Sequence, residues 1–163
     1  MTESILASPS VARVRAALAA AGVDADIVAL PGAARTAQAA ADALGCAVAQ
    51  IANSLVFRLE RSNRALLVMS SGANRVDVNR LATLAGEPGG KADAAFVREA
   101  TGFAIGGVAP VGHPAPLRTL VDRSLLAFDE IWAAAGHPHT VFRLTPAVLV
   151  QITGGEIADT ARG

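Results

Sequence analysis

Five segments of the chain are predicted to be helices, and in three of them apolar residues recur with a helical spacing. Between Val11 and Ala21 they return every three or four residues, which predicts a helix that Ser8-Pro9-Ser10 caps and Gly22 ends. Residues 78–85 and 94–100 share this spacing, and two further segments are marked as helices by the proline or glycine residues that bound them. We expect these further helices over residues 36–44, 78–85 and 94–100, and a last helix that begins near Thr145-Pro146.

Other apolar runs are short and rich in residues that favour strands. The longest, residues 51–59, alternates in part between apolar and polar positions, and the polar turn 61–63 joins it to a second run at 65–69. Residues 87–90 are expected to form a turn. A short strand is expected over 26–30, and three more apolar runs lie around 117–121, 127–133 and 140–144. Strands that alternate with helices indicate a mixed α/β fold around a single sheet.

The helical pattern stops at residues 103–116, which read FAIGGVAPVGHPAP. A stretch so rich in glycine and proline cannot form a long helix or an ordinary central strand. Loops of this length in compact domains are usually functional, and glycine amides can approach a ligand closely. We therefore expect a ligand pocket beside this loop.

Composition limits the classes of protein that remain. The chain has 163 residues, of which 52% are hydrophobic and 17% charged, so we expect one folded domain over 1–163 with its core at about 10–153. Basic and acidic residues balance at 14 each, which excludes nucleic-acid binding through bulk charge. The one cysteine, Cys46, excludes an internal disulfide. With no signal peptide and no membrane-spanning stretch in the sequence, a cytoplasmic location is expected.

The three histidines are the clearest candidates for other chemistry. His137 and His139 lie two residues apart and could share a metal, but a three-histidine zinc site would also need His113 to converge on them. No acidic or cysteine ligand falls at a recognisable spacing, so no metal and no cofactor is expected, and hydrogen bonding at a pocket rim is the better interpretation. No serine lies in a G-x-S-x-G motif, which argues against a serine hydrolase.

Four stretches of the sequence resemble the motifs of one family. They are residues 54–57, 71–77, 99–113, and 128–132 followed by Ala135-Gly136. In this order they resemble the YbaK family of aminoacyl-tRNA deacylases, which is related to the editing domain inserted in bacterial prolyl-tRNA synthetases. The glycine loop matches that family's G-x-x-x-P motif as Gly106 and Pro110.

This resemblance implies a curved mixed β-sheet flanked by helices, and a trans-acting enzyme that hydrolyses the ester of mischarged tRNA. A water molecule would attack the ester, and the amides of Gly106 and Gly107 would hold the developing oxyanion. The implied partners are the acceptor end of aminoacyl-tRNA and an aminoacyl-tRNA synthetase, with no membrane, and the expected assembly is a monomer or a weak homodimer. The implied substrate-binding residues are Ser54, Gly72, Asn74, Val108, Pro110, His113, Gly136, His137 and His139.

The sequence departs from the family at one catalytic position. The family usually carries a lysine directly before Ser54, whereas this chain has Asn53, which can donate a hydrogen bond but supplies no charge. Lys91 is the only lysine, and because it lies in a different segment it is not expected to substitute. Three outcomes stay open: an altered substrate, hydrolysis carried by other groups, or a catalytically silent module that binds an aminoacyl-adenosine-like ligand or the acceptor end.

Overall fold

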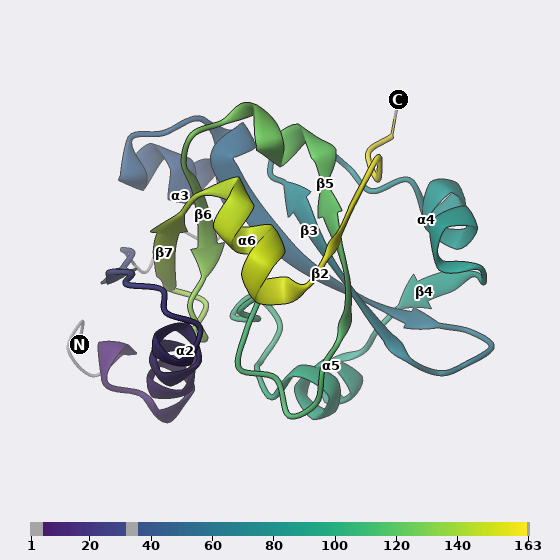
Figure 1. Ribbon diagram of the computed structural model, residues 1–163, viewed down its shortest axis with the longest axis horizontal. Coiled ribbons are helices and arrows are strands. Elements are labelled where there is room, and N and C mark those ends of the chain that lie inside the picture. Colours follow the sequence, from purple (N-terminus) through teal and green to yellow (C-terminus); the bar gives the residue numbers. More distant parts are fainter. Residues whose placement is uncertain (1–4, 32–35, 163) are drawn as a thin grey trace.

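The computed structural model describes residues 5–31 and 36–162, which form a mixed β-sheet with helices around it (Figure 1). The strands are β1 (Ile27–Ala29), β2 (Ile51–Leu59), β3 (Ala65–Ser71), β4 (Gly89–Lys91), β5 (Arg118–Asp122), β6 (Ile131–Ala134), β7 (Thr140–Leu144) and β8 (Glu156–Ala158). The α-helices are α2 (Pro9–Ala20), α3 (Ala37–Leu44), α4 (Val78–Ala85), α5 (Ala94–Thr101) and α6 (Pro146–Thr153), and two 3-10 helices are η1 (Val48–Gln50) and η2 (Arg123–Ala127).

The strand order is β1-β7-β6-β2-β3-β5-β8, and β4 pairs with β2 off this path. The β2–β3, β2–β4, β6–β7 and β1–β7 pairs are antiparallel, whereas β2–β6, β3–β5 and β5–β8 are parallel. A mixed sheet flanked by helices confirms the predicted fold class. No helix within residues 5–31 and 36–162 is long and apolar enough to cross a membrane.

Local sequence sets the helix boundaries as predicted. The Ser8 hydroxyl accepts a hydrogen bond from the Val11 amide at the start of α2, and side chains of Thr36, Asp77, Asp93 and Thr145 cap the later helices in the same way. Glycines in the left-handed conformation end α3, α4, α5 and α6. Helices α2 to α5 therefore begin and end within one or two residues of their predicted limits, and α6 begins where it was predicted to begin.

Three short elements differ from the predictions. The expected turn at 87–90 is in part strand β4, whose Gly89 and Gly90 pair with Leu59 and Arg58 of β2. The apolar run at 127–133 is divided between the end of η2 and β6. Strand β8, which pairs in parallel with β5, had no predicted counterpart. Strands this short depend on partners far away in the sequence, so no local pattern marks them.

The two faces of the sheet are covered differently. Successive residues of a strand point to opposite faces. Ala52 and Val56 of β2 point into the central core, which α2, α5 and α6 help to form. On the opposite face Ile51 packs with α3 and Leu59 packs with α4. Figure 1 shows α3 and α4 near opposite ends of the sheet, and between them Leu55 is 38% exposed.

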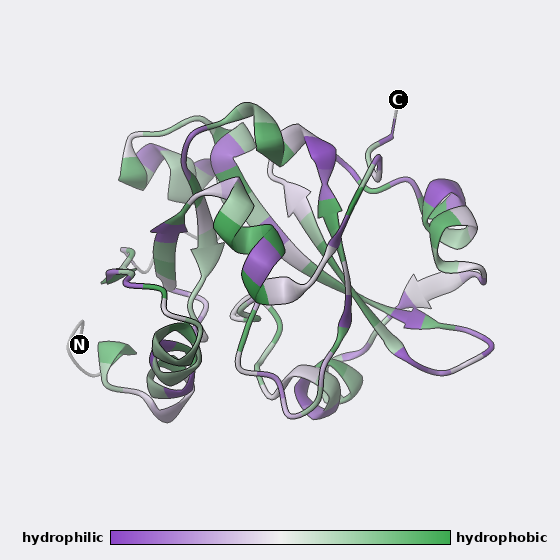
Figure 2. Ribbon diagram, viewed as in Figure 1, coloured by the Kyte–Doolittle hydropathy of each residue, from purple (hydrophilic) through white to green (hydrophobic). Residues whose placement is uncertain are grey.

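Hydropathy follows this arrangement. Apolar residues concentrate along the sheet and on α6, whereas the turn between β2 and β3 is hydrophilic (Figure 2). In the middle of β2, Leu55 belongs to neither the cluster with α3 nor the cluster with α4, and it is exposed.

Candidate functional site

The site begins at a gap along one edge of β2. Strand β6 pairs with Ile51 and Ala52, and β4 pairs with residues 57–59. Residues 53–56 lie between these two pairings and, within the described chain, pair only with β3 on the other edge. The glycine-rich loop comes to this gap, where Ile105 and Gly106 line cavities together with Ser54 and Leu55.

Two cavities meet at this gap and form a two-lobed pocket. We call the first the β4 lobe: it has a volume of about 400 Å³ and is lined by Phe57, Val78, Lys91, Val97 and Val108. The second, the α3 lobe, measures about 260 Å³ and is lined by Ala37, Asn53, Trp132, Pro138 and Thr140. The lobes share Ser54, Leu55, Ile105 and Gly106, so a ligand could extend from one lobe into the other.

The surface of the β4 lobe is unusually apolar for an open site. Ile105 is 57% exposed, Val78 is 51% exposed, and both line this lobe together with the partly exposed Leu55. Large exposed apolar side chains that gather in a concavity mark a ligand-binding surface. A larger hollow of about 650 Å³ lies beside the β2–β3 turn, but none of the predicted site residues lines it.

Gly106 and Gly107 have different structural roles. Gly106 lies exposed at the tip of the loop with φ +89°, a conformation that side chains rarely adopt. A Cβ at Gly107 would lie 3.0 Å from the backbone of His137, so that glycine allows the loop to pack against the β6–β7 turn. The Gly107 amide donates to the Ala104 carbonyl at 2.9 Å, whereas none of the hydrogen bonds between described residues uses the Gly106 amide.

His113, near the end of the glycine-rich loop, contacts earlier residues of the same loop. Its Nε2 lies 2.7 Å from the Ala109 carbonyl oxygen, and its ring meets the edge of Phe103 at 6.2 Å between centroids. Burial lowers the pKa of His113; the Ala109 contact opposes this shift, and the Arg13 guanidinium adds to it. That guanidinium lies 4.5 Å from the centroid of the Phe103 ring. His113 lines neither lobe, although Val108 does. Pro110, within the same loop, is buried.

His137 and His139 lie in the β6–β7 turn and bracket Pro138, which lines the α3 lobe while they do not. The His139 amide donates to Nδ1 of His137 at 3.1 Å, and the two ring centroids are 5.5 Å apart. Burial lowers the pKa of His137, and the nearby His139 lowers it further. A Cβ at Gly136 would lie 2.7 Å from the Ser10 carbonyl oxygen, so Gly136 permits close packing against α2.

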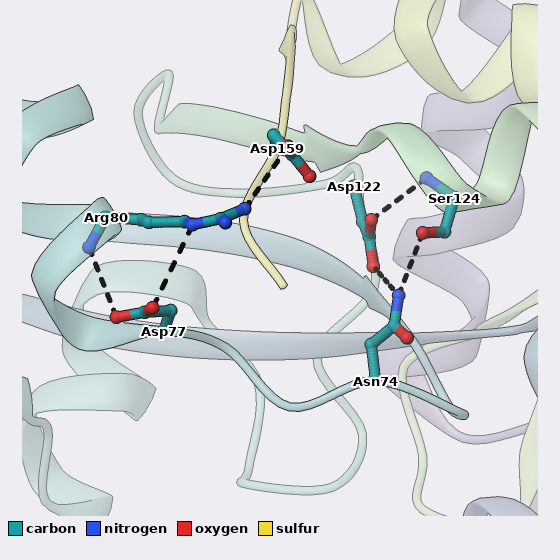
Figure 3. A network of polar contacts seen from close by, with 6 residues as sticks. All are labelled: Asn74, Asp77, Arg80, Asp122, Ser124 and Asp159. Carbon is teal, nitrogen blue, oxygen red and sulfur yellow. Dashed lines mark hydrogen bonds and ion pairs between the residues drawn. The ribbon is translucent and has the colours of Figure 1, made fainter. Parts of the chain in front are cut away.

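Gly72 and Asn74 lie at the end of β3 and line neither lobe. The Asn74 amide donates to Asp122 Oδ2 at 3.0 Å and to Ser124 Oγ at 2.9 Å (Figure 3). Asp122 is fully buried and also accepts the amide of Ser71. A Cβ at Gly72 would lie 2.6 Å from the Val48 carbonyl oxygen. Both residues therefore hold the backbone at this end of the sheet.

The structure adds pocket residues that the sequence did not indicate. Lys91 and Val78 line the β4 lobe, Trp132 lines the α3 lobe, and Ile105 lines both. The only sequence signal for Lys91 is that the chain has no other lysine. Among the described residues, no group of three or more histidine, cysteine, aspartate or glutamate side chains is placed to hold a metal ion.

Comparisons with known proteins identify the family of the chain. A profile of the aminoacyl-tRNA editing domain matches residues 32–152. YwhH of Bacillus subtilis (strain 168), an uncharacterized protein, is 29% identical over 122 residues, which are 75% of this chain and 77% of YwhH. A crystal structure of a proposed trans-editing enzyme for prolyl tRNA synthetase superposes with a TM-score of 0.91 and 46% identity, over 96% of this chain and 99% of that one.

A second solved structure, the hypothetical protein APE2540, superposes with a TM-score of 0.84 at 29% identity and covers 92% of this chain and 99% of its own. Profile and structures agree over most of the described residues. The chain therefore belongs to the aminoacyl-tRNA editing domain family, and its predicted relationship to the YbaK deacylases is confirmed.

Proposed function

We propose that this protein hydrolyses the ester bond of mischarged aminoacyl-tRNA as a trans-acting editing enzyme. The observation that carries the proposal is the two-lobed pocket at the gap in β2, with the Gly106 amide and Asn53 beside the junction of its lobes. One lobe can receive the aminoacyl group and the other the terminal nucleoside, which places the ester between them.

The backbone amide of Gly106 is the donor that we assign to the ester carbonyl. A donor that is not engaged within the protein can hold the oxygen as it becomes an anion, and one such donor contributes roughly 3 kcal/mol of transition-state stabilisation. Asn53 can add a second hydrogen bond from its side-chain amide. Because the Gly107 amide already donates to Ala104, we assign Gly107 a positioning role through its packing on the β6–β7 turn.

The nucleophile in this proposal is water. It adds to the ester carbonyl carbon, and the bond between that carbon and the ribose oxygen breaks. The ribose oxygen leaves with a proton that comes from the attacking water, so the products are the free amino acid and the tRNA. No charged side chain is found among the described residues that line the α3 lobe, so this scheme uses hydrogen-bond donors and the neighbouring ribose hydroxyl rather than a protein base.

The partner we propose is the acceptor end of a tRNA. Zero net charge suits a protein that handles only this end and needs few phosphate contacts. Since the structural relative with 46% identity is described as acting for prolyl tRNA synthetase, mischarged proline tRNA is the first substrate to test, and the synthetase is a further proposed partner.

Single-turnover hydrolysis of a panel of matched and mismatched aminoacyl-tRNAs tests the proposal. Selective deacylation of one mismatched tRNA, unaffected by a chelator, is the expected result. The second candidate function, a silent binding module, is favoured by Asn53, which supplies no charge at the catalytic position. Tight binding of an uncleavable analogue with no hydrolysis of any tRNA in the panel would support that module and overturn the enzyme.

A further inference from the structure

Lys91 lies at the end of β4 and lines the β4 lobe. It pairs directly with Phe57 of β2, and paired residues point to the same face of a sheet. Residues 53, 55 and 57 share that face because side chains alternate along a strand. Lys91 therefore lies on the same side of the sheet as Asn53 and Leu55, which form the floor of the pocket.

The distance along β2 separates Lys91 from the catalytic position. Asn53 and Phe57 are four residues apart, which is about 13 Å along a strand. A lysine side chain cannot span that distance and act on the group that Asn53 contacts. Lys91 is instead placed to contact another part of the same ligand, in the β4 lobe.

The charge of Lys91 is not neutralised within the described structure. The ion pairs among residues 5–31 and 36–162 do not include Lys91, and no carboxylate lines the β4 lobe. The Glu60 carboxylate lies beside Gly90, which pairs with Arg58 and so belongs to the opposite face. None of the described residues that line the α3 lobe is charged, so Lys91 is the one charged group among the described lining residues of the two lobes.

We propose that Lys91 binds a phosphate of the terminal nucleotide, so that the nucleotide occupies the β4 lobe and the aminoacyl group the α3 lobe. The inference rests on the proposed function. An aminoacyl ester carries a free ammonium group, which Lys91 would repel, whereas phosphates are the anionic groups of an aminoacyl-tRNA near the ester. The same charge distribution thus selects the phosphate end and fixes the direction of the ligand.

The test compares two uncleavable analogues, a 3′-aminoacylamido adenosine with a 5′-phosphate and the same compound without it. The wild-type protein is expected to bind the phosphorylated analogue about fivefold more tightly, the upper range for one exposed ion pair. Lys91→Gln should remove that preference and leave binding of the other analogue unchanged, and Lys91→Arg should keep it. Arg123→Gln, which removes an exposed cation outside both lobes, is the control.

Salt dependence gives a second readout. Affinity of the wild-type protein for the phosphorylated analogue should fall as salt rises, because salt screens an exposed ion pair, and Lys91→Gln should lose most of this dependence. If wild type binds both analogues equally, or if Lys91→Gln weakens both equally, the phosphate site is overturned while the proposed function stands. If wild type binds neither analogue and hydrolyses no aminoacyl-tRNA, the proposed function fails and this inference fails with it.

Discussion

Two polar regions flank the sheet centre, and they differ in how their hydrogen-bonding groups are used. At the end of β3, the buried carboxylate of Asp122 accepts the amide of Ser124 and the side chain of Asn74 (Figure 3), and it also accepts the amide of Ser71; all three distances are 3.0 Å. At the gap in β2, the hydrogen bonds and ion pairs among described residues leave the Gly106 amide and the Lys91 ammonium unused.

The difference separates a structural site from a ligand site. Buried polar groups that satisfy one another stabilise one arrangement of the chain and have no capacity left for a ligand. Donors that lie unused in an apolar concavity gain most when a ligand supplies the acceptor. Substitutions in the first region should therefore change stability, and substitutions in the second should change binding or rate.

Asp122→Asn should produce the largest effect and should act on stability. The new amide group must face donors whichever way it points, because both carboxylate oxygens of Asp122 accept hydrogen bonds. We expect the free energy of unfolding to fall by about 3 kcal/mol, measured by chemical denaturation. Asp159→Asn, at a side chain that is 73% exposed, is the control and should change it little. Equal stability of both variants would contradict the structural role of the Asp122 network.

Gly106→Val tests the other region and should act on rate. Its β-branched side chain is incompatible with φ +89° at the loop tip, so the amide should move from its position at the lobe junction. We expect kcat/KM for deacylation to fall about a hundredfold, the effect of losing one oxyanion donor. Gly22→Val is the matched control, since Gly22 has φ +73° and open space around it. A Gly106→Val protein that is folded and fully active would remove Gly106 from the mechanism.

Sequence pattern predicted the elements whose signals are local. The caps at Thr36, Asp77 and Asp93 and the glycines after each helix mark boundaries that the structure confirms. The position of the glycine-rich loop beside a cavity was predicted for the same reason, because glycine and proline exclude regular structure directly.

The rest depends on pairs that are distant in the sequence. Strand β4 was expected to be a turn because Gly89-Gly90 carries a turn signal, and only its pairing with β2 brings Lys91 into the pocket. Asn74 was predicted to bind substrate, but its amide lies against Asp122, 48 residues later in the chain. No local pattern reports such a contact, so the sequence could not distinguish a ligand-binding amide from one that holds the fold.

Asn53→Lys tests the ligand site by adding a positive charge where Asn53 lines the α3 lobe. A charged donor makes hydrogen bonds about twice as strong as a neutral one, so we expect the single-turnover rate to rise about fivefold. Asn53→Ala should lower it, because the side-chain donor is lost. If Asn53→Lys hydrolyses no substrate while the uncleavable analogue still binds, the silent binding module becomes the better account of this chain.

Acidification should have the smallest effect on stability, and we expect it to act through His113 of the glycine-rich loop. Burial holds the pKa of His113 below its usual value of 6.5, so the unfolded chain takes up a proton at a higher pH than the folded protein does. The contribution of the neutral His113 ring to the free energy of unfolding is therefore complete above pH 6.5, and it should be lost as the pH falls through the folded pKa. His113→Gln can keep a donor to the Ala109 carbonyl but cannot titrate, so its denaturation midpoint should decline less steeply between pH 7 and pH 5.

His137→Gln provides the comparison, because the pKa of His137 is also lowered but its ring does not contact the loop carbonyl. Activity gives a readout that is specific to the loop. At pH 5, His113→Gln should retain more of its neutral-pH rate than wild type or His137→Gln. Equal losses in all three proteins would show that protonation of His113 does not act on the loop.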